Sequence, residues 1–155
     1  MASFLAPYLP KTAGWLAYWQ LLVATTAVFN TVQNFVTLKF TRRVYNNVPS
    51  ATGTRLSPHT PLLTQEIPVT ALQARTFAVW TLTSAIIRAY AAYNINNKNI
   101  YDMAFFTYLI AFGHFSSELF IFRTCKLGPG VISPVIVSTT SLIWMFTQYD
   151  FYVRS

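Results

Sequence analysis

The segment IYDMAFFTYLIAFGHFSSELFIF, residues 100–122, is an almost unbroken apolar run. It is long enough to cross a bilayer as a helix, which takes about 20 residues. Its acidic and basic side chains are Asp102, His114 and Glu118. The run therefore predicts a transmembrane helix that carries a few polar groups.

Three further apolar segments have similar length, at about residues 14–38, 71–93 and 131–152. The chain is 54% hydrophobic and only 10% charged, whereas soluble domains carry roughly 25% charged residues. Its mean hydropathy is +0.40. These features predict an all-α membrane protein, with four transmembrane helices in a single domain over residues 1–155.

The connections between the predicted helices differ in length. NINNKN (94–99) and KLGPG (126–130) are short and carry turn-forming residues, so each predicts a tight helical hairpin. The linker at about 39–70, between the first two helices, is rich in Pro, Ser and Thr in its later part. The composition of residues 44–70 predicts an extended or disordered segment.

The net charge of +7 is unevenly distributed along the chain. Most cations flank the linker and the 126–130 turn, where they follow apolar runs. The positive-inside rule therefore predicts a multi-pass protein with a cytosolic linker and both termini in the lumen or outside the cell. Because these cations do not alternate with aromatic residues on a polar face, they do not indicate nucleic-acid binding.

The second and third helices bring buried charges to similar depths. If the hairpin turns at the centre of residues 94–99, Arg75 lies level with Glu118, and Arg88 lies within one turn of Asp102. Charges inside membrane proteins usually pair with one another. We therefore predict an Arg75–Glu118 ion pair and a second, looser Arg88–Asp102 pair.

His114 and Glu118 are one helical turn apart and admit two interpretations. Small residues, including Ala78, Ala85 and Ala111, line the predicted contact between the second and third helices. On that face His114 would form an interhelical hydrogen bond. The alternative is a metal ligand or proton carrier, but a zinc site needs more ligands than this pair supplies. We favour the structural interpretation.

No catalytic motif accompanies these groups. The chain has no nucleophile elbow, phosphate-binding loop or dinucleotide-binding glycine pattern. Its single cysteine, Cys125, permits no disulfide within the chain. The sequence therefore predicts a protein without catalytic, cofactor or metal sites.

Two other polar groups are candidates for contact with proteins or lipids. The first predicted helix carries an amide patch, for which hydrogen bonding between helices is favoured over contact with a lipid hydroxyl. A basic cluster then begins the linker and could contact a partner or anionic headgroups. The residues are Asn30, Gln33 and Asn34 in the patch, and Lys39, Arg42 and Arg43 in the cluster.

Several long segments resemble the ergosterol biosynthetic protein 28 family. They include GWLAYWQLLVATTAVFNTVQNF (14–35), TLKFTRRVY (37–45) and SPVIVSTTSLIWMFTQYDFY (133–152). Within residues 72–122, the pieces QARTF, WTLTSAIIRAYAAY and IYDMAFFTYLIAFGHFSSE are also similar to it. The chain departs from the family pattern at Asn94, where histidine is common.

The resemblance implies a non-catalytic scaffold of the endoplasmic-reticulum membrane that acts in sterol biosynthesis. Its implied partners are the C-4 demethylation enzymes: the C-4 methyl sterol oxidase, the decarboxylating C-3 dehydrogenase and the 3-keto reductase. It also implies links to the sterol C-24 methyltransferase and self-association.

Two other functions remain open from the residues alone. A small sterol-binding or sterol-transfer protein would need an apolar cleft with polar groups for the sterol oxygen, which His114 and the amide patch could supply. An enzyme using His114 with Glu118 is the third alternative.

Overall fold

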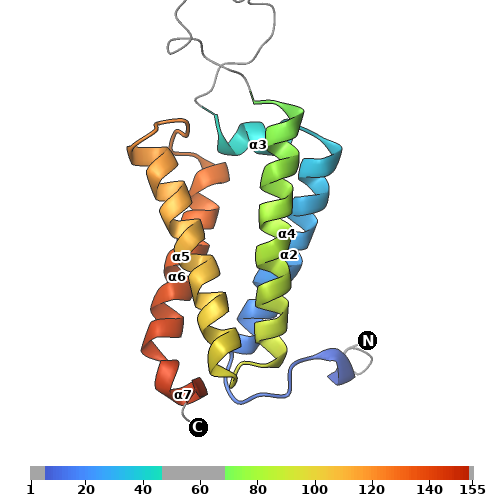
Figure 1. The fold of residues 1–155 in the computed structure, drawn as a ribbon, viewed down its shortest axis with the longest axis vertical. Helices are drawn as coiled ribbons and strands as arrows, with labels where there is room; N and C mark the ends of the chain where they lie inside the picture. The colour runs from blue at the N-terminus through green and yellow to red at the C-terminus, as the bar shows by residue number, and fades with distance from the viewer. Residues whose placement is uncertain (1–5, 47–68, 154–155) are drawn as a thin grey trace, which may run out of the picture.

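A computed structural model of the protein describes residues 6–46 and 69–153 (Figure 1). Within these ranges it contains helices and no strand, so the all-α prediction is confirmed. The elements are the 3-10 helix η1 (Ala6–Tyr8) and the α-helices α2 (Leu16–Val36), α3 (Lys39–Val44), α4 (Ala71–Tyr93), α5 (Lys98–Phe120), α6 (Pro129–Thr147) and α7 (Tyr149–Val153).

The four long helices run alongside one another as a bundle (Figure 1). Helix α2 packs mainly on α4, α5 packs mainly on α6, and α4–α5 contacts join the two pairs. Both chain ends and the α4–α5 turn lie at one end of the bundle. Helix α3 and the α5–α6 connection lie at the other end, which we call the α3 end. The two predicted hairpins are therefore present.

The boundary of α4 matches the predicted 71–93, and its start has a physical cause. The Thr70 hydroxyl oxygen accepts a hydrogen bond from the Gln73 N–H, and Gln73 Oε1 accepts one from the Thr70 N–H. This capping box satisfies two backbone donors that a helix start leaves unpaired.

Residues 39–44, at the start of the predicted linker, form helix α3, which the sequence did not predict. The extended backbone of Thr37 ends α2, and the Thr37 hydroxyl accepts a hydrogen bond from the Lys39 N–H. Thr41 and Val44 are buried, so tertiary packing stabilises a helix too short to persist alone. The rest of the predicted linker, residues 47–68, lies outside the described residues.

The predicted fourth helix, 131–152, is divided in two. Helix α6 begins at Pro129, a position that a proline tolerates because no helical hydrogen bond needs its nitrogen. It ends at Thr147, and α7 follows. The Tyr152 hydroxyl of α7 accepts a hydrogen bond from the Leu16 N–H. The chain end therefore satisfies an unpaired donor at the start of α2.

The small-residue face of α4 packs against α2, which corrects the predicted contact with α5. Ala74, Ala78 and Ala85 are buried on this face. The hydroxyl of Thr31 in α2 reaches the Ala78 carbonyl oxygen at 3.3 Å. Because alanine lets helix backbones approach closely, the predicted seam forms but joins a different pair of helices.

The interior of the bundle combines apolar side chains with several polar ones, while many large apolar side chains lie on the outside. Buried positions include Gln20, Arg88, Ser138 and Ser141 beside many alanines. Each long helix exposes large apolar side chains, among them Phe29 and Val32 on α2, Val79 and Trp80 on α4, Phe106 and Ile110 on α5, and Ile136 and Phe146 on α6.

Helix α6 is the one described helix whose length and apolar composition alone suffice to cross a membrane. The other long helices carry more polar residues, such as Arg75 and Arg88 on α4. The assignment of four transmembrane helices therefore remains a prediction.

Candidate functional site

A buried arginine connects α4 to α5. Arg88 is 7% exposed. Its Nε donates to Thr107 Oγ1 at 3.0 Å, and its Nη2 donates to the Thr107 carbonyl oxygen at 3.3 Å. The guanidinium carbon lies 4.0 Å from the centroid of the Tyr108 ring. Stacking and hydrogen bonds together stabilise this buried cation.

The network continues to the other two long helices. The Tyr108 hydroxyl donates to Gln20 Oε1 at 2.8 Å, and Gln20 Nε2 donates to Met145 Sδ at 3.1 Å. The Tyr101 hydroxyl donates to the Met145 carbonyl oxygen at 2.7 Å. Side chains from α2, α4, α5 and α6 therefore meet in one buried network, which favours a single arrangement of the helices.

The predicted Arg88–Asp102 pair is wrong. Asp102 instead accepts from Lys98 Nζ at 2.5 Å, one turn earlier on α5. Arg88 lies level with Thr107 rather than with residue 105, so the hairpin arithmetic misplaced the contact by about two residues. Pairing Asp102 with the exposed Lys98 has a small desolvation cost, because neither group has to leave water completely.

The second group joins α3 to α5. The Tyr45 hydroxyl lies 2.7 Å from His114 Nε2, and His114 Nδ1 lies 4.0 Å from Glu118 Oε1. Burial raises the pKa of the Tyr45 phenol, with a smaller contribution from the negative charge of Glu118. The phenol therefore keeps its proton and can donate it to His114 in a hydrogen bond. His114 does form a hydrogen bond to another segment, but its partner is Tyr45, the residue that follows α3, rather than a residue of α4.

The predicted Arg75–Glu118 pair is also wrong. Glu118 accepts a hydrogen bond from the Thr124 hydroxyl in the α5–α6 connection, while Arg75 is exposed on α4. Lys98–Asp102 is an ion pair, and His114–Glu118 is a 4.0 Å contact that is ionic only when the imidazole is protonated; neither includes Arg75.

An aromatic cluster explains why Arg75 and Glu118 do not meet. The Tyr45 ring from α3 packs edge-on against Phe77 of α4 at 5.9 Å, and Phe77 packs against Phe115 of α5 at 6.3 Å. These rings fill the space between α4 and α5 at the α3 end. Equal depth along two helices therefore does not bring the charged side chains into contact.

The amide patch serves α3 rather than a contact between long helices. Asn34 Nδ2 donates to Asn30 Oδ1 at 2.7 Å and to the Asn30 carbonyl oxygen at 2.8 Å. Its Oδ1 accepts from the Thr41 hydroxyl at 2.6 Å. Asn34 is buried and Gln33 is half-buried. Two amides of the patch thus fix the position of α3 against the end of α2.

Cys125 lies in a small apolar cluster at the α3 end. It is 3% exposed and packs with Val44, Phe115 and Val131. Burial raises the pKa of the thiol, the Thr124 hydrogen bond lowers it, and the negative charge of Glu118 raises it. Because the thiolate is the reactive form, we expect weak reactivity at neutral pH.

Alkylation tests this expectation. At pH 7.5, iodoacetamide should modify Cys125 in the folded protein at least about tenfold more slowly than in the same protein unfolded in detergent and urea. Equal rates in the two states would contradict the burial of this thiol. The rate also reports on the packing of α3, since Val44 covers the same cluster.

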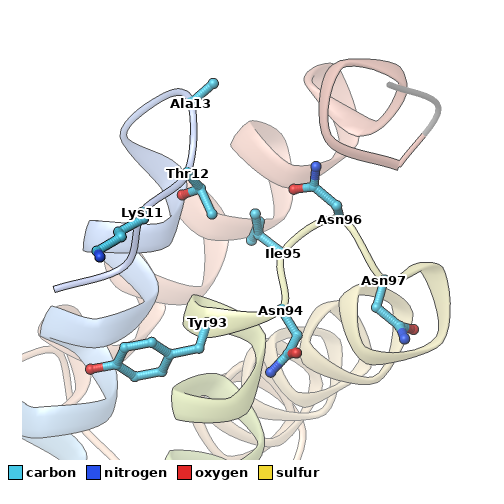
Figure 2. Close-up of a pocket in the computed structure, with 8 residues that line it drawn as sticks. All are labelled: Lys11, Thr12, Ala13, Tyr93, Asn94, Ile95, Asn96 and Asn97. Atoms are coloured by element: carbon cyan, nitrogen blue, oxygen red, sulfur yellow. The ribbon is translucent and has the colours of Figure 1, made fainter. Parts of the chain in front are cut away.

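A pocket of about 360 Å³ lies beside the α4–α5 turn, at the opposite end of the bundle. Figure 2 shows the residues that line it. The segment before α2 contributes Lys11, Thr12 and Ala13. Tyr93 and the α4–α5 turn, which includes Asn94, form the rest of its wall. Asn94 Nδ2 donates to the Tyr90 carbonyl oxygen. The pocket wall contains no carboxylate, histidine or thiol, so it offers no acid–base pair or nucleophile of these kinds.

Sequence reasoning missed the main partners in both polar groups. Tyr45 and Tyr108 gave no signal, because Tyr is common in apolar segments, while Thr107 was placed on the contact face without being assigned to Arg88. Gln20 was detectable, as an amide inside a predicted membrane helix needs a partner. Within the described residues, no three His, Cys, Asp or Glu side chains come together as metal ligands.

The geometry defines a class of protein: an all-helical bundle with a buried polar network in its core, many large apolar side chains on its outer faces, and polar groups that hold helices together. The Erg28 family model, described as "Erg28 like protein", matches residues 16–143. The chain therefore belongs to the Erg28 family.

Curated relatives agree with this assignment. "Ergosterol biosynthetic protein 28" of Candida albicans is 42% identical, over 99% of this chain and 100% of the relative. The Saccharomyces cerevisiae protein of the same name is 42% identical, over 93% and 85% of the two chains. The Mus musculus "Ergosterol biosynthetic protein 28 homolog" is 36% identical, over 84% and 81%. No solved structure matches the chain.

Proposed function

We propose that this protein is a non-catalytic membrane scaffold in ergosterol biosynthesis. It tethers the C-4 methyl sterol oxidase, the decarboxylating C-3 dehydrogenase and the 3-keto reductase at the endoplasmic reticulum. The sterol C-24 methyltransferase and a second copy of the chain are further partners. The names of the relatives place them in ergosterol biosynthesis, and tethering successive enzymes raises their effective concentration.

The observation that carries the proposal is the exposure of many large apolar side chains on a bundle whose core contains a polar network. Large apolar side chains cover the outer faces of α2, α4, α5 and α6, while Gln20, Arg88 and Tyr108 meet inside. Water disfavours this arrangement, whereas hydrocarbon favours it. We therefore propose four transmembrane helices, with α3 on the cytosolic side and both termini in the lumen, as the distribution of cations favours.

The engagement of the candidate site residues supports a role without catalysis. His114 is bonded to Tyr45, Glu118 to Thr124, and Arg88 to Thr107. A general acid or base needs a proton-transfer partner in a substrate-accessible position. These side chains instead join helices, so partner enzymes would perform the chemistry while binding to the outer faces of the bundle.

Co-purification from native membranes tests the scaffold. A tagged full-length chain should recover the oxidase, the dehydrogenase and the reductase together. The variant His114→Gln should recover them equally and sustain normal sterol flux, because glutamine retains a hydrogen-bond acceptor for Tyr45. A matched control is a tagged, unrelated multi-pass protein of the same membrane.

Two outcomes would reject the scaffold. Loss of flux in His114→Gln with all three enzymes still recovered would indicate catalysis by this chain. Absence of the enzymes, combined with photo-crosslinking of a sterol probe to the purified protein, would indicate a sterol-binding or sterol-transfer protein.

A further inference from the structure

The two ends of the bundle differ strongly in charge. Each end contains charged residues from several elements. At the α3 end the described charged residues are Lys39, Arg42, Arg43, Arg75, Arg123, Lys126 and Glu118; at the opposite end they are Lys11, Lys98, Asp102 and Asp150. Cations therefore exceed carboxylates at the α3 end alone.

Helix α3 is held firmly across this end. Its buried Thr41 donates to Asn34 at 2.6 Å, and the following Tyr45 bonds His114 at 2.7 Å. Asn46 Oδ1 accepts from the Lys126 N–H at 2.6 Å, which fastens the end of α3 to the α5–α6 connection. Polar contacts thus secure both the middle and the end of this short helix.

The same contacts determine which side chains α3 exposes. With Thr41 and Val44 directed inward, Lys39, Arg42 and Arg43 remain exposed. Arg43 lies over the Phe40 ring at 5.4 Å. Cations on a fixed helix lose less conformational entropy on binding than cations on a flexible segment. The hydrogen bonds of Asn34 and His114, two polar residues that the sequence identified as candidates, therefore hold the cations of α3 in a preorganised surface.

Large apolar side chains surround the cations at this end. Phe120 is 72% exposed, and Ile121, Phe122 and Leu127 in the α5–α6 connection are similarly exposed. A water-facing surface for an acidic soluble partner does not need these groups. A lipid interface accommodates both the apolar side chains and the cations, because apolar side chains enter the acyl region while cations contact headgroup phosphates.

We propose that α3 and the adjoining α5–α6 connection bind anionic phospholipids, with Lys39, Arg42 and Arg43 contacting the headgroup phosphates. The proposal rests on the membrane location proposed above. The cytosolic leaflet, where we place α3, is the one that carries anionic lipid. Binding there would hold α3 against the membrane surface and fix the depth of the bundle.

Lipid titration of the purified full-length protein tests the proposal. In neutral detergent, phosphatidylserine should raise the thermal unfolding midpoint, and phosphatidylcholine or inorganic phosphate should not. Arg42→Gln/Arg43→Gln should weaken the apparent affinity for phosphatidylserine about 25-fold, since each basic residue near an anionic surface contributes about fivefold. Both side chains are exposed, so its midpoint without lipid should equal that of the wild type.

The matched control removes two exposed cations from the opposite end. Lys11→Gln/Lys98→Gln has the same net charge and should retain the wild-type affinity for phosphatidylserine. Thr41→Val keeps every cation but loosens α3, so it should weaken the affinity by a few fold.

Three results would overturn the proposal. The first is an unchanged affinity for phosphatidylserine in Arg42→Gln/Arg43→Gln. The second is an equal loss of affinity in both double variants. The third is that Arg42→Gln/Arg43→Gln no longer recovers the enzymes by co-purification while its response to phosphatidylserine stays intact. The last would assign α3 to an acidic protein surface. The lipid titration uses purified protein and lipid alone. A negative result in it therefore does not bear on the scaffold proposal, which the co-purification test addresses separately.

Discussion

Replacing Gly130 with alanine is expected to destabilise the protein by about 2–3 kcal/mol, in the range for overpacking a close contact. A Cβ atom at this position would overlap the Arg43 carbonyl oxygen and lie 2.7 Å from the carbonyl carbon and 3.1 Å from the Val44 nitrogen. These are backbone atoms of α3, so no side-chain rotation relieves the overlap. Either α3 or the start of α6 must move.

The displacement should be visible locally as well as globally. Gly130 adjoins Val131, which packs with Val44 and Cys125. We therefore expect Gly130→Ala to lower the unfolding midpoint in detergent and to speed alkylation of Cys125 in the folded protein. The two measurements separate a general loss of stability from a shift of α3.

Gly113→Ala is the matched control. Gly113 lies inside α5, and nothing lies within 4 Å of the position its Cβ would occupy. Alanine there should stabilise the protein by about 0.5–1 kcal/mol, because glycine is a poor helix former. If Gly130→Ala matched or exceeded the stability of Gly113→Ala, the close contact between α3 and α6 would be contradicted.

Helix positions were predictable from the sequence, and α4 shows why. Its apolar run is bounded by a capping threonine and by the 94–97 turn, so local signals determine both ends. No such local signal predicted helix α3. Its stability depends on Thr41 meeting Asn34 and on Val44 meeting Val131, which are contacts between separate segments.

The side-chain pairs were less predictable, for a geometric reason. The hairpin arithmetic gives the depth of a residue along its helix but not the direction of its side chain. Arg88 contacted α5 within two residues of the expected level, yet its partner was Thr107 rather than Asp102. Neutral groups such as a threonine hydroxyl and a tyrosine ring can stabilise a buried cation, and a search restricted to opposite charges misses them.

Thr107→Val is expected to destabilise the bundle by about 1.5–3 kcal/mol, the range for a hydrogen bond to a charged group. Valine nearly preserves the shape of threonine but removes the Oγ1 acceptor that Arg88 Nε reaches at 3.0 Å. The buried guanidinium would keep its 3.3 Å bond to the Thr107 carbonyl oxygen and its stacking on Tyr108. One of its donors would then be buried without an acceptor.

The control for this change is Thr83→Val on α4. Thr83 is exposed, and its hydroxyl donates to the Val79 carbonyl oxygen of the same helix. Its replacement should change the free energy of unfolding by less than about 0.5 kcal/mol, as is usual for surface substitutions. Equal effects at the two threonines would show that Arg88 does not depend on the Thr107 hydroxyl.

A double-mutant cycle with Arg88→Met then separates packing from charge. Replacing a buried ionic group with an apolar residue of similar volume is often neutral or stabilising, and methionine can keep the contact with the Tyr108 ring. Without the guanidinium, Thr107→Val no longer leaves a buried donor without an acceptor. Its effect on the free energy of unfolding should therefore fall to that of Thr83→Val. If Thr107→Val destabilised the Arg88→Met protein as much as the wild type, the loss of stability would come from the packing of α5 and not from the guanidinium.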